Sequence, residues 1–579
     1  MGQDEHEQRR AKGAHVRRLV VAQGALDRVE VVDPPRIEPN LAYRPRAKWV
    51  VGPAGELGLF ASEGDHVVVD TPGCLVVDPR LLAAVEPLRG MLRGDGGRLA
   101  RALRGVDVRL ARSPRDGGAS VLATLIVRRG SGLEADVRGA ARAWIRASSA
   151  IAGIAVSEVD PASPQLLGGA PTLLEGSGVV EDAAGSVPIL AVHGAFVQAH
   201  AGVAAHLERA LVAEARRIGA RARVLELFAG SGAFGLAVAA SGALVTSVES
   251  FAPAAARIEE AARRAGLAVR ALASDAERFV VDAAQRQESF DLVIVDPPRR
   301  GLPPALRRAL ARLKPAAIAY VSCSPLTLAR DLDHLARLGF APERVETFDM
   351  MPQSDEVESL AIVRPAPRPT LTIAAATEEL VAIVVPPHTS PREVERAASS
   401  ALGSPDVVAV AAIPPDASGL ALFARSEAAA ARARASLELS CTAVVRGIAR
   451  EKGAIARPAR ASRDARTRYR RRGTAGGHAV LLLTILGGGD LEAASTHLAW
   501  IGHPPLGDER RCDPRTRQHL FERYGLDRSF VHVGGVRVGD ELVATCPLAA
   551  DLEAVLAGLR AATRPTSPRR RSEPARDDP

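Results

Sequence analysis

The chain has 579 residues, of which 47% are hydrophobic and 25% charged, a composition typical of globular protein and a length too great for one hydrophobic core. No run approaches the roughly 18 uninterrupted apolar residues of a membrane span, and the N-terminus lacks the pattern of a secretory signal. We therefore expect no membrane partner and a cytoplasmic location. The formal net charge of +8 permits a polyanionic partner, because lysines and arginines release the counterions of phosphates.

The five cysteines lie far apart and include no C-x-x-C pair. This spacing argues against both a disulfide framework and a tetrahedral zinc site, so we expect no metal.

The first part of the chain is predicted to hold two segments. Residues 1–40 are polar and poorly patterned, and we expect them to be partly flexible. From Tyr43 onward, short alternating runs such as Lys48–Val51 and His66–Val69 indicate strands, so residues 41–184 are predicted to form a β-rich or mixed front module.

From residue 185 to 365 apolar strands alternate with helices rich in alanine and arginine, the rhythm of a parallel, doubly wound sheet. The clearest predicted strands are Arg223–Phe228, Leu244–Val248, Asp291–Val295 and Ala317–Val321. An α/β Rossmann-like fold is expected here.

A glycine-rich loop, Glu226–Gly235 (ELFAGSGAFG), ends the first of these strands, and Gly230 and Gly232 allow the backbone to approach a ligand. Glu249 ends the next strand, where an acidic side chain can hold ribose hydroxyls. Because Gly235 completes a GxGxxG spacing, the loop alone does not distinguish a nicotinamide dinucleotide from S-adenosylmethionine. Asp296, in the stiff segment DPPRRG after a third strand, favours a methyl-transfer site.

Two further residues are candidates for chemistry. Cys323 follows the strand Ala317–Val321, so its sulfur should lie at the same sheet edge as Asp296 and the glycine loop. A cysteine there can act as a nucleophile through its thiolate. Glu358, just before an apolar strand, is the candidate general base.

The last third of the chain is predicted to be a second globular unit. Arg364–Thr372 holds three prolines in nine residues, so residues 366–375 are interpreted as a linker. Residues 376–563 are interpreted as the unit and residues 564–579 as a disordered tail. The stretch Arg457–Arg472 is rich in arginine, and Tyr469 within it is a candidate for stacking on bases.

Residues from about 41 to 365 resemble the RNA 5-methyluridine methyltransferases. The resemblance rests on six ordered segments: Phe196–His200 (FVQAH), ELFAGSG, Glu249, DPPRRG, Ser322–Asp331 (SCSPLTLARD) and Val357-Glu358. It implies a class I methyltransferase fold that methylates uracil C5 in ribosomal or transfer RNA. The residues implied to bind S-adenosylmethionine are Gln198, Phe228, Gly230, Gly232, Ala233, Glu249, Asp275 and Asp296.

The resemblance also implies roles for the candidate pair. The Cys323 thiolate would attack uracil C6, which makes C5 nucleophilic toward a methyl group, and Glu358 would then remove the C5 proton. Several family members hold an iron-sulfur cluster on four N-terminal cysteines. Only Cys74 corresponds to that set here, and since one thiolate cannot hold a cluster, none is expected.

The second unit resembles, more faintly, the pseudouridine synthases, which would make it an α+β domain. Pro414 stands where that family has its nucleophilic aspartate, and Cys441 replaces the usual tyrosine. Since proline has no carboxylate, pseudouridine synthase activity is predicted to be absent. The unit is interpreted either as an RNA clamp or as a purely structural partner. The alternative for the whole chain is a non-catalytic RNA-binding or ribosome-assembly factor built from two enzyme-like domains.

Overall fold

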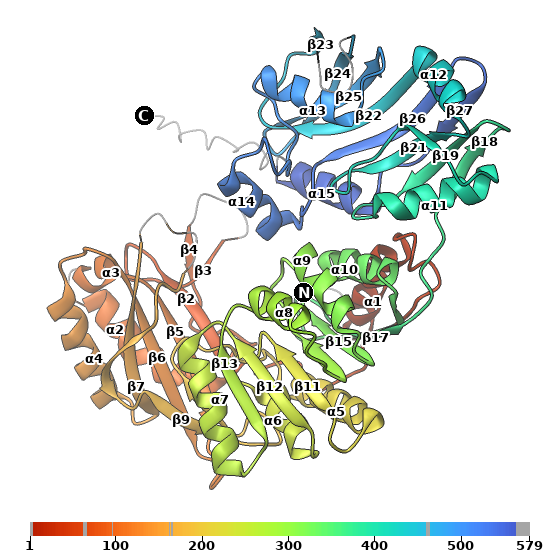
Figure 1. Ribbon diagram of the computed structural model, residues 1–579. Coiled ribbons are helices and arrows are strands. Elements are labelled where there is room, and N and C mark those ends of the chain that lie inside the picture. Colours follow the sequence, from red (N-terminus) through yellow and green to blue (C-terminus); the bar gives the residue numbers. More distant parts are fainter. Residues whose placement is uncertain are drawn as a thin grey trace, which may run out of the picture.

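The computed structural model describes residues 4–61, 67–94, 97–160, 163, 166–458 and 464–562. The chain forms three regions, which Figure 1 shows as an orange front module, a yellow-to-green central region joined by the red N-terminal helix, and a cyan-to-blue C-terminal unit that lies over the central region. The predicted tail lies outside the described residues.

The central region is built on an eight-stranded sheet with the order β1-β16-β17-β15-β14-β11-β12-β13. Strands β13, β12, β11, β14 and β15 are parallel, whereas β17 runs antiparallel to both β15 and β16. The strands are β1 Glu30–Val32, β11 Arg223–Leu227, β12 Leu244–Glu249, β13 Val269–Ala273, β14 Leu292–Val295, β15 Ala317–Ser322, β16 Phe340–Phe348 and β17 Glu358–Pro365. This is the sheet of a class I methyltransferase, so the predicted fold is confirmed.

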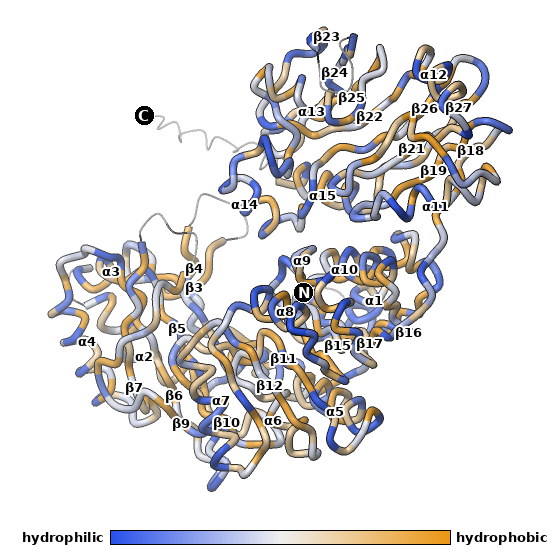
Figure 2. Tube along the Cα trace, viewed as in Figure 1, coloured by the Kyte–Doolittle hydropathy of each residue, from blue (hydrophilic) through white to orange (hydrophobic). Residues whose placement is uncertain are grey.

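Helices cover both faces of this sheet. One face packs against α1 (Glu5–Val21), α8 (Ala276–Gln285), α9 (Pro304–Leu313) and α10 (Pro325–Arg337), and the other against α5 (Ala201–Ile218), α6 (Ala233–Ala240) and α7 (Ala252–Ala265). The central strands are hydrophobic (Figure 2), as expected of strands buried on both faces.

The N-terminal segment, which was expected to be poorly patterned, contains a helix and a strand in its described residues. Val16 and Val20 of α1 are fully buried against the central region, and Lys12 pairs with Asp349 at 2.5 Å. Strand β1 extends the sheet alongside β16. The weak periodicity of residues 1–40 hid this helix, because its apolar contact is a narrow stripe on a polar helix.

The front module holds a seven-stranded sheet with the order β4-β3-β2-β5-β6-β7-β8 and a hairpin of β9 and β10. Its strands are β2 Arg46–Val51, β3 Leu57–Phe60, β4 Val68–Asp70, β5 Leu103–Arg112, β6 Ala119–Arg128, β7 Ile151–Val159, β8 Thr172–Gly176, β9 Val179–Asp182 and β10 Ile189–Val192; its helices are α2 Pro79–Gly94, α3 Arg98–Ala102 and α4 Glu134–Ala147. The buried Trp144 packs in this core and donates its indole N–H to the carbonyl of Ala84 at 2.8 Å.

The C-terminal unit is an α+β domain, as predicted, with a ten-stranded, mostly antiparallel sheet. Its strands are β18 Thr372–Ala376, β19 Leu380–Val385, β20 Val408–Ala411, β21 Ser418–Ala424, β22 Leu437–Val445, β23 Lys452–Ala456, β24 Arg466–Ala475, β25 His478–Leu486, β26 Val531–Val538 and β27 Leu542–Thr545. Its helices are α11 Pro391–Leu402, α12 Glu427–Ser436, α13 Leu491–Trp500, α14 Pro514–Tyr524 and α15 Ala550–Ala561. Strand β18 already begins within the segment expected to be a linker.

Candidate functional site

A cavity of about 600 Å³ lies at the carboxyl edge of the central sheet, where the strand order reverses between β11 and β14. Its lining includes both candidate reacting groups and most of the predicted cofactor residues: Gln198, Phe228, Gly230, Glu249, Asp296, Cys323 and Glu358. A volume of this size accommodates a small-molecule ligand together with a base.

Cys323 and Glu358 reach the cavity from two neighbouring strands. The antiparallel pairing of β15 with β17 ends with Ser322 opposite Ser359. Cys323 and Glu358 are the next residues along the two strands, so they lie across from one another. The sheet register therefore joins a thiol and a carboxyl group that are far apart in sequence.

The Cys323 thiol is half-buried and resists ionisation. Burial, together with the negative charges of Glu358 and Asp296, raises its pKa to about 12. The guanidinium of Arg299 opposes this shift. A cation placed in the cavity would favour the thiolate for the same electrostatic reason.

Glu358 is 5% exposed, and its Oε1 has no hydrogen-bond partner among the described residues. Burial, with the nearby charge of Asp296, holds the pKa of this carboxyl well above its usual value. A carboxylate with a raised pKa is a stronger base, which suits proton abstraction near neutral pH.

Asp296 follows β14 and accepts a hydrogen bond from Gln198 Nε2 at 2.9 Å. Burial raises the pKa of Asp296 to about 7, and the charge of Glu226 adds to the shift. Three carboxyl groups, those of Glu249, Asp296 and Glu358, thus border the cavity, and its lining also carries the basic side chains of Arg44, Arg46, Lys48 and Arg299. The carboxyl groups near Cys323 favour a cation beside the thiol.

The glycine-rich loop is fixed by two acidic side chains. Glu249 accepts hydrogen bonds from the N–H groups of Gly230 and Phe251, each at 2.8 Å. Beneath the loop, the buried Glu226 accepts from Gly235 N at 2.9 Å and from Ser247 Oγ at 2.6 Å. A Cβ at Gly235 would lie 2.2 Å from the Glu226 carboxylate, so a larger residue there would displace this carboxylate from its hydrogen bonds.

The remaining predicted cofactor residues lie nearby but not on the cavity wall. Ala233 borders a smaller neighbouring cavity of about 60 Å³, which Gln198 and Asp296 also line. Gly232, with φ +76°, precedes α6, and a Cβ there would meet Ile258 at 2.7 Å. Asp275 caps α8 by accepting from Arg278 N at 2.9 Å.

Sequence reasoning missed Arg299 and assigned no role to His200. Arg299 lines the cavity and pairs with Glu356 at 2.6 Å, and its place three residues after Asp296 could have indicated it. His200, where the family pattern has asparagine, caps α5: its Nδ1 accepts from Gly202 N and Val203 N. A capping acceptor is what asparagine also provides.

In the C-terminal unit, Pro414 lies in the loop before β21, and Cys441 is fully buried in β22. Burial raises the pKa of the Cys441 thiol far above its usual value. The expectation that Tyr469 is available for stacking is wrong, because Tyr469 is 8% exposed and belongs to the domain core, packed against Gly453.

The described residues include no group of three or more His, Cys, Asp or Glu side chains placed to hold a metal ion. Of the helices in the same described ranges, none is both long and apolar enough to cross a membrane.

Comparisons with known proteins give matches to parts of the chain. The family model described as conserved hypothetical protein 95 matches residues 209–335. The 23S rRNA (uracil(1939)-C(5))-methyltransferase RlmD of Chromohalobacter salexigens is 33% identical over 57% of this chain and 66% of its own length. The 23S rRNA (uracil(747)-C(5))-methyltransferase RlmC of Shewanella loihica is 36% identical over 32% of this chain and 48% of its own. The chain thus spans between about half and two thirds of these relatives.

Among solved structures, the Pyrococcus abyssi tRNA (uracil-54, C5)-methyltransferase in complex with S-adenosyl-L-homocysteine covers 62% of this chain and 83% of its own, with 22% identity and a TM-score of 0.48. Human RNA pseudouridylate synthase domain containing 1 covers 32% of this chain and 86% of its own, with 16% identity and a TM-score of 0.26.

Proposed function

We propose that this chain, which is related to the RNA uracil-C5 methyltransferases, transfers a methyl group from S-adenosylmethionine to C5 of a uridine in ribosomal or transfer RNA. The observation that carries the proposal is that Cys323 and Glu358, whose Oε1 has no hydrogen-bond partner among the described residues, border one cavity beside the glycine loop and Asp296. We place the activity in the cytoplasm, where such RNA is found.

The residues present fit S-adenosylmethionine. Gln198, Phe228, Gly230, Glu249 and Asp296 would hold it, since they offer an aromatic face, an amide and two carboxylates on one wall. When bound, the cofactor supplies an electrophilic methyl group and a positive sulfonium. The carboxyl groups of the cavity would attract that charge.

The chain's own residues would carry out the other steps. Cys323 Sγ bonds to uracil C6, which moves electron density to C5 and allows C5 to take the methyl group. Glu358 then accepts the C5 proton, and the bond between sulfur and C6 breaks, which restores the base and the free cysteine. Because Cys323 is half-buried, the target uridine has to leave its stack to reach it.

Methyl transfer from labelled S-adenosylmethionine to ribosomal and transfer RNA tests this function. Cys323→Ala should abolish transfer. Glu358→Gln should also block turnover but accumulate a denaturant-resistant protein–RNA adduct, because the C5 proton is not removed and the thiol cannot leave. Cys74→Ala is the matched control, since Cys74 borders the same cavity and should be dispensable. Transfer by the Cys323→Ala variant at the wild-type rate would contradict the proposal, and a protein that binds no S-adenosylmethionine would favour a non-catalytic factor.

The C-terminal unit serves in this proposal as an RNA clamp without catalysis of its own. Strand β24 supports it, because Arg466, Arg468 and Arg470 are exposed at alternate positions and so project from one face. Part of the arginine-rich stretch, residues 459–463, lies outside the described residues. With Pro414 in place of an aspartate, the unit should form no pseudouridine in RNA, which mapping of modified RNA can check.

A further inference from the structure

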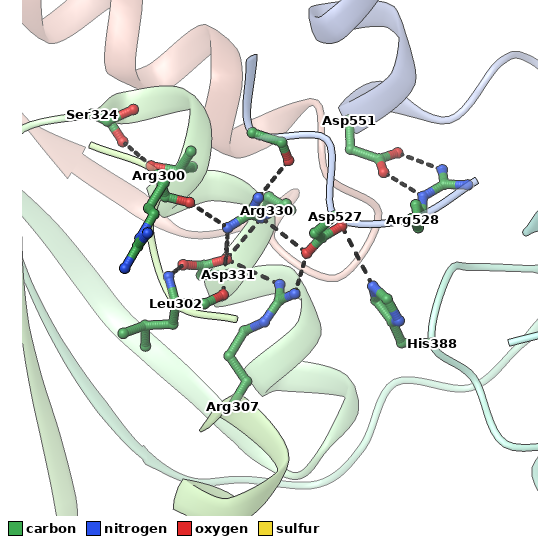
Figure 3. Close-up of polar contacts among 12 residues, drawn as sticks. Arg300, Leu302, Arg307, Ser324, Arg330, Asp331, His388, Asp527, Arg528 and Asp551 are labelled. Carbon is green, nitrogen blue, oxygen red and sulfur yellow. Dashed lines mark hydrogen bonds and ion pairs between the residues drawn. The ribbon is translucent and has the colours of Figure 1, made fainter. Parts of the chain in front are cut away.

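A buried group of charges crosses from the C-terminal unit into the methyltransferase region (Figure 3). Arg307 of α9 donates from Nη1 to Asp331 Oδ1 at 2.9 Å, and its Nη2 pairs with Asp527 Oδ2. Arg330 of α10 contacts the same two carboxylates, at 2.8 Å from Nε to Asp331 Oδ1 and 3.5 Å to Asp527 Oδ2. Arg307 and Asp331 are 0% exposed and Asp527 is 3% exposed.

On the methyltransferase side, this group holds the elements that carry the reacting residues. Asp331 Oδ2 accepts hydrogen bonds from Leu302 N at 2.6 Å and from Tyr320 Oη at 2.7 Å. Arg330 Nη2 donates to the carbonyl of Arg300 at 3.0 Å. Leu302 and Arg300 lie at the end of the loop that begins at Asp296, and Tyr320 lies in β15, three residues before Cys323.

On the other side, the end of α14 is in close contact with the start of α10. Arg330 Nη1 donates to the carbonyl of Gly525 at 2.5 Å. A Cβ at Gly525, which has φ +69°, would lie 2.9 Å from Thr327 Cγ2. The ring of Phe521 covers the guanidinium of Arg330 at 5.6 Å and that of Arg300 at 5.9 Å.

The balance of charge depends on Asp527. Arg307 and Arg330 are two buried cations that face two buried anions, Asp331 and Asp527. Arg330 and Arg307 hold the pKa of Asp527 well below its usual value, although burial by itself would raise this pKa. Without Asp527, both guanidinium groups would compete for Asp331, which also holds Leu302 and Tyr320, and an uncompensated buried charge is costly.

We propose that Asp527 is a positioning residue of the methyltransferase site: acting through Arg307 and Arg330, it fixes the loop from Asp296 to Leu302 and the start of α10. The C-terminal unit thereby completes the methyltransferase in the same chain. This inference rests on the proposed function, to which it adds a role for the second unit other than binding RNA.

The test compares Asp527→Asn with Asp551→Asn in the full-length protein. Asp551 forms a buried pair with Arg528, at 2.6 Å from Nε, within the C-terminal unit. We expect Asp527→Asn to lower kcat by roughly ten- to a hundredfold, because small misplacements of reacting groups have effects of that size, while KM for RNA stays within about twofold. Asp551→Asn should keep the wild-type kcat, and Asp527→Glu should recover part of it.

Alkylation of Cys323 by iodoacetamide, followed by mass spectrometry, gives a second readout that needs no methyl transfer. Its rate should change in Asp527→Asn and not in Asp551→Asn. Equal effects of the two variants on both readouts, or none from Asp527→Asn, would overturn the inference. If the wild type transferred no methyl group, the proposed function would fail while this comparison still decided the positioning role.

Should Asp527→Asn fail to fold, Phe521→Ala replaces it, because that change removes the ring from the rim of the same contact. It is expected to lower kcat at unchanged KM for RNA and to change the alkylation rate of Cys323. Wild-type values of both quantities would overturn the inference.

Discussion

The groups that face Cys323 work against its ionisation. Two carboxyl groups, Glu358 and Asp296, lie in the same cavity as the thiol, and the guanidinium of Arg299, which opposes their effect, is shared with Glu356. The resting site should therefore hold a neutral thiol, and the thiolate should form only when a positive ligand or the substrate changes the balance of charge.

The reaction of Cys323 with iodoacetamide should show this raised pKa. With a thiol pKa of about 12, the alkylation rate is expected to rise steadily with pH up to at least pH 10. At pH 8 it should be roughly a hundredfold or more below that of a free cysteine, since each pKa unit changes the thiolate fraction about tenfold. Mass spectrometry of the labelled peptide provides the measurement. A rate that levels off near pH 9 would show that the thiol is unperturbed.

Glu226 should make the folding free energy depend on pH. Burial raises its pKa to about 7 in the folded protein, above the ordinary value of 4.5. The folded state therefore favours the protonated carboxyl. The stability that this group contributes to the folded protein is fully present below about pH 4.5 and is lost as the pH rises through about 7. Glu226→Gln avoids that loss, and it should be more stable than the wild type by about 2 to 3 kcal/mol at pH 8 but not at pH 4.5.

Denaturant unfolding at the two pH values measures this difference. Ser247→Ala serves as the comparison, because it removes a hydrogen bond to Glu226 without removing the titrating group. If Glu226→Gln changed the stability equally at both pH values, Glu226 would make no pH-dependent contribution and its raised pKa would be contradicted.

Among single elements, β24 shows how strand geometry sorts one arginine-rich stretch into two faces. Thr467 and Tyr469 point into the core, where Thr467 Oγ1 and His497 Nδ1 are 2.8 Å apart. Arg468 and Arg470, between and beyond them, face solvent. Alternation along a strand thus makes half of the stretch structural and leaves the other half free for phosphates.

Removing arginines from the exposed face of β24 should weaken RNA binding in a salt-dependent manner. Arg468→Gln combined with Arg470→Gln is expected to raise KM for RNA at unchanged kcat. It should also reduce the slope of log affinity against log salt by about 1.5, since each phosphate contact contributes about 0.7 to 0.9. Filter binding at several salt concentrations provides the slope.

Arg392→Gln with Arg396→Gln, on the exposed face of α11, is the matched control for charge. The clamp role would be contradicted if both double variants changed the slope equally, or if neither did.

Over the whole molecule, the two enzyme-like regions share one buried ion group. Arg307 of α9 and Asp527, which precedes β26, are 220 residues apart, and both are buried in the same contact. Separating the two regions would leave buried charges without their partners and expose the backbone packed at the contact. We therefore expect the two regions to unfold together.

Scanning calorimetry should show this coupling. The full chain is expected to give one unfolding transition for the central and C-terminal regions. Asp527→Asn should lower the free energy of unfolding by about 3 to 5 kcal/mol and split this transition into two. Glu522→Gln is the control: it alters an exposed pair with Arg300 at 3.7 Å and an exposed hydrogen bond from Gln518 Nε2 at 2.6 Å, and the loss of the pair should cost about 1 kcal/mol or less. Two transitions in the wild type would contradict the coupling.

The sequence by itself determined the alternation of strands and helices in the central region and the residues that end each strand. Those are local properties: apolar runs mark buried strands, and a residue that follows a parallel strand is bound to lie at the ligand edge of the sheet. On that basis Cys323, Asp296 and the glycine loop could be placed together. The sequence alone also shows that Pro414 offers no carboxylate.

Only the tertiary structure decided the rest. Strand β17 runs antiparallel beside β15 and places Glu358 opposite Cys323. Helix α1 buries a narrow apolar stripe that its mostly polar sequence does not reveal, and the side chain of Tyr469 lies in the core of the C-terminal unit. Asp527 meets Arg307 and Arg330 through a contact between regions far apart in the chain. Periodicity reports how one segment divides its faces, but it carries no information about which distant segment each face meets, and that pairing is set by packing and charge balance across the folded chain.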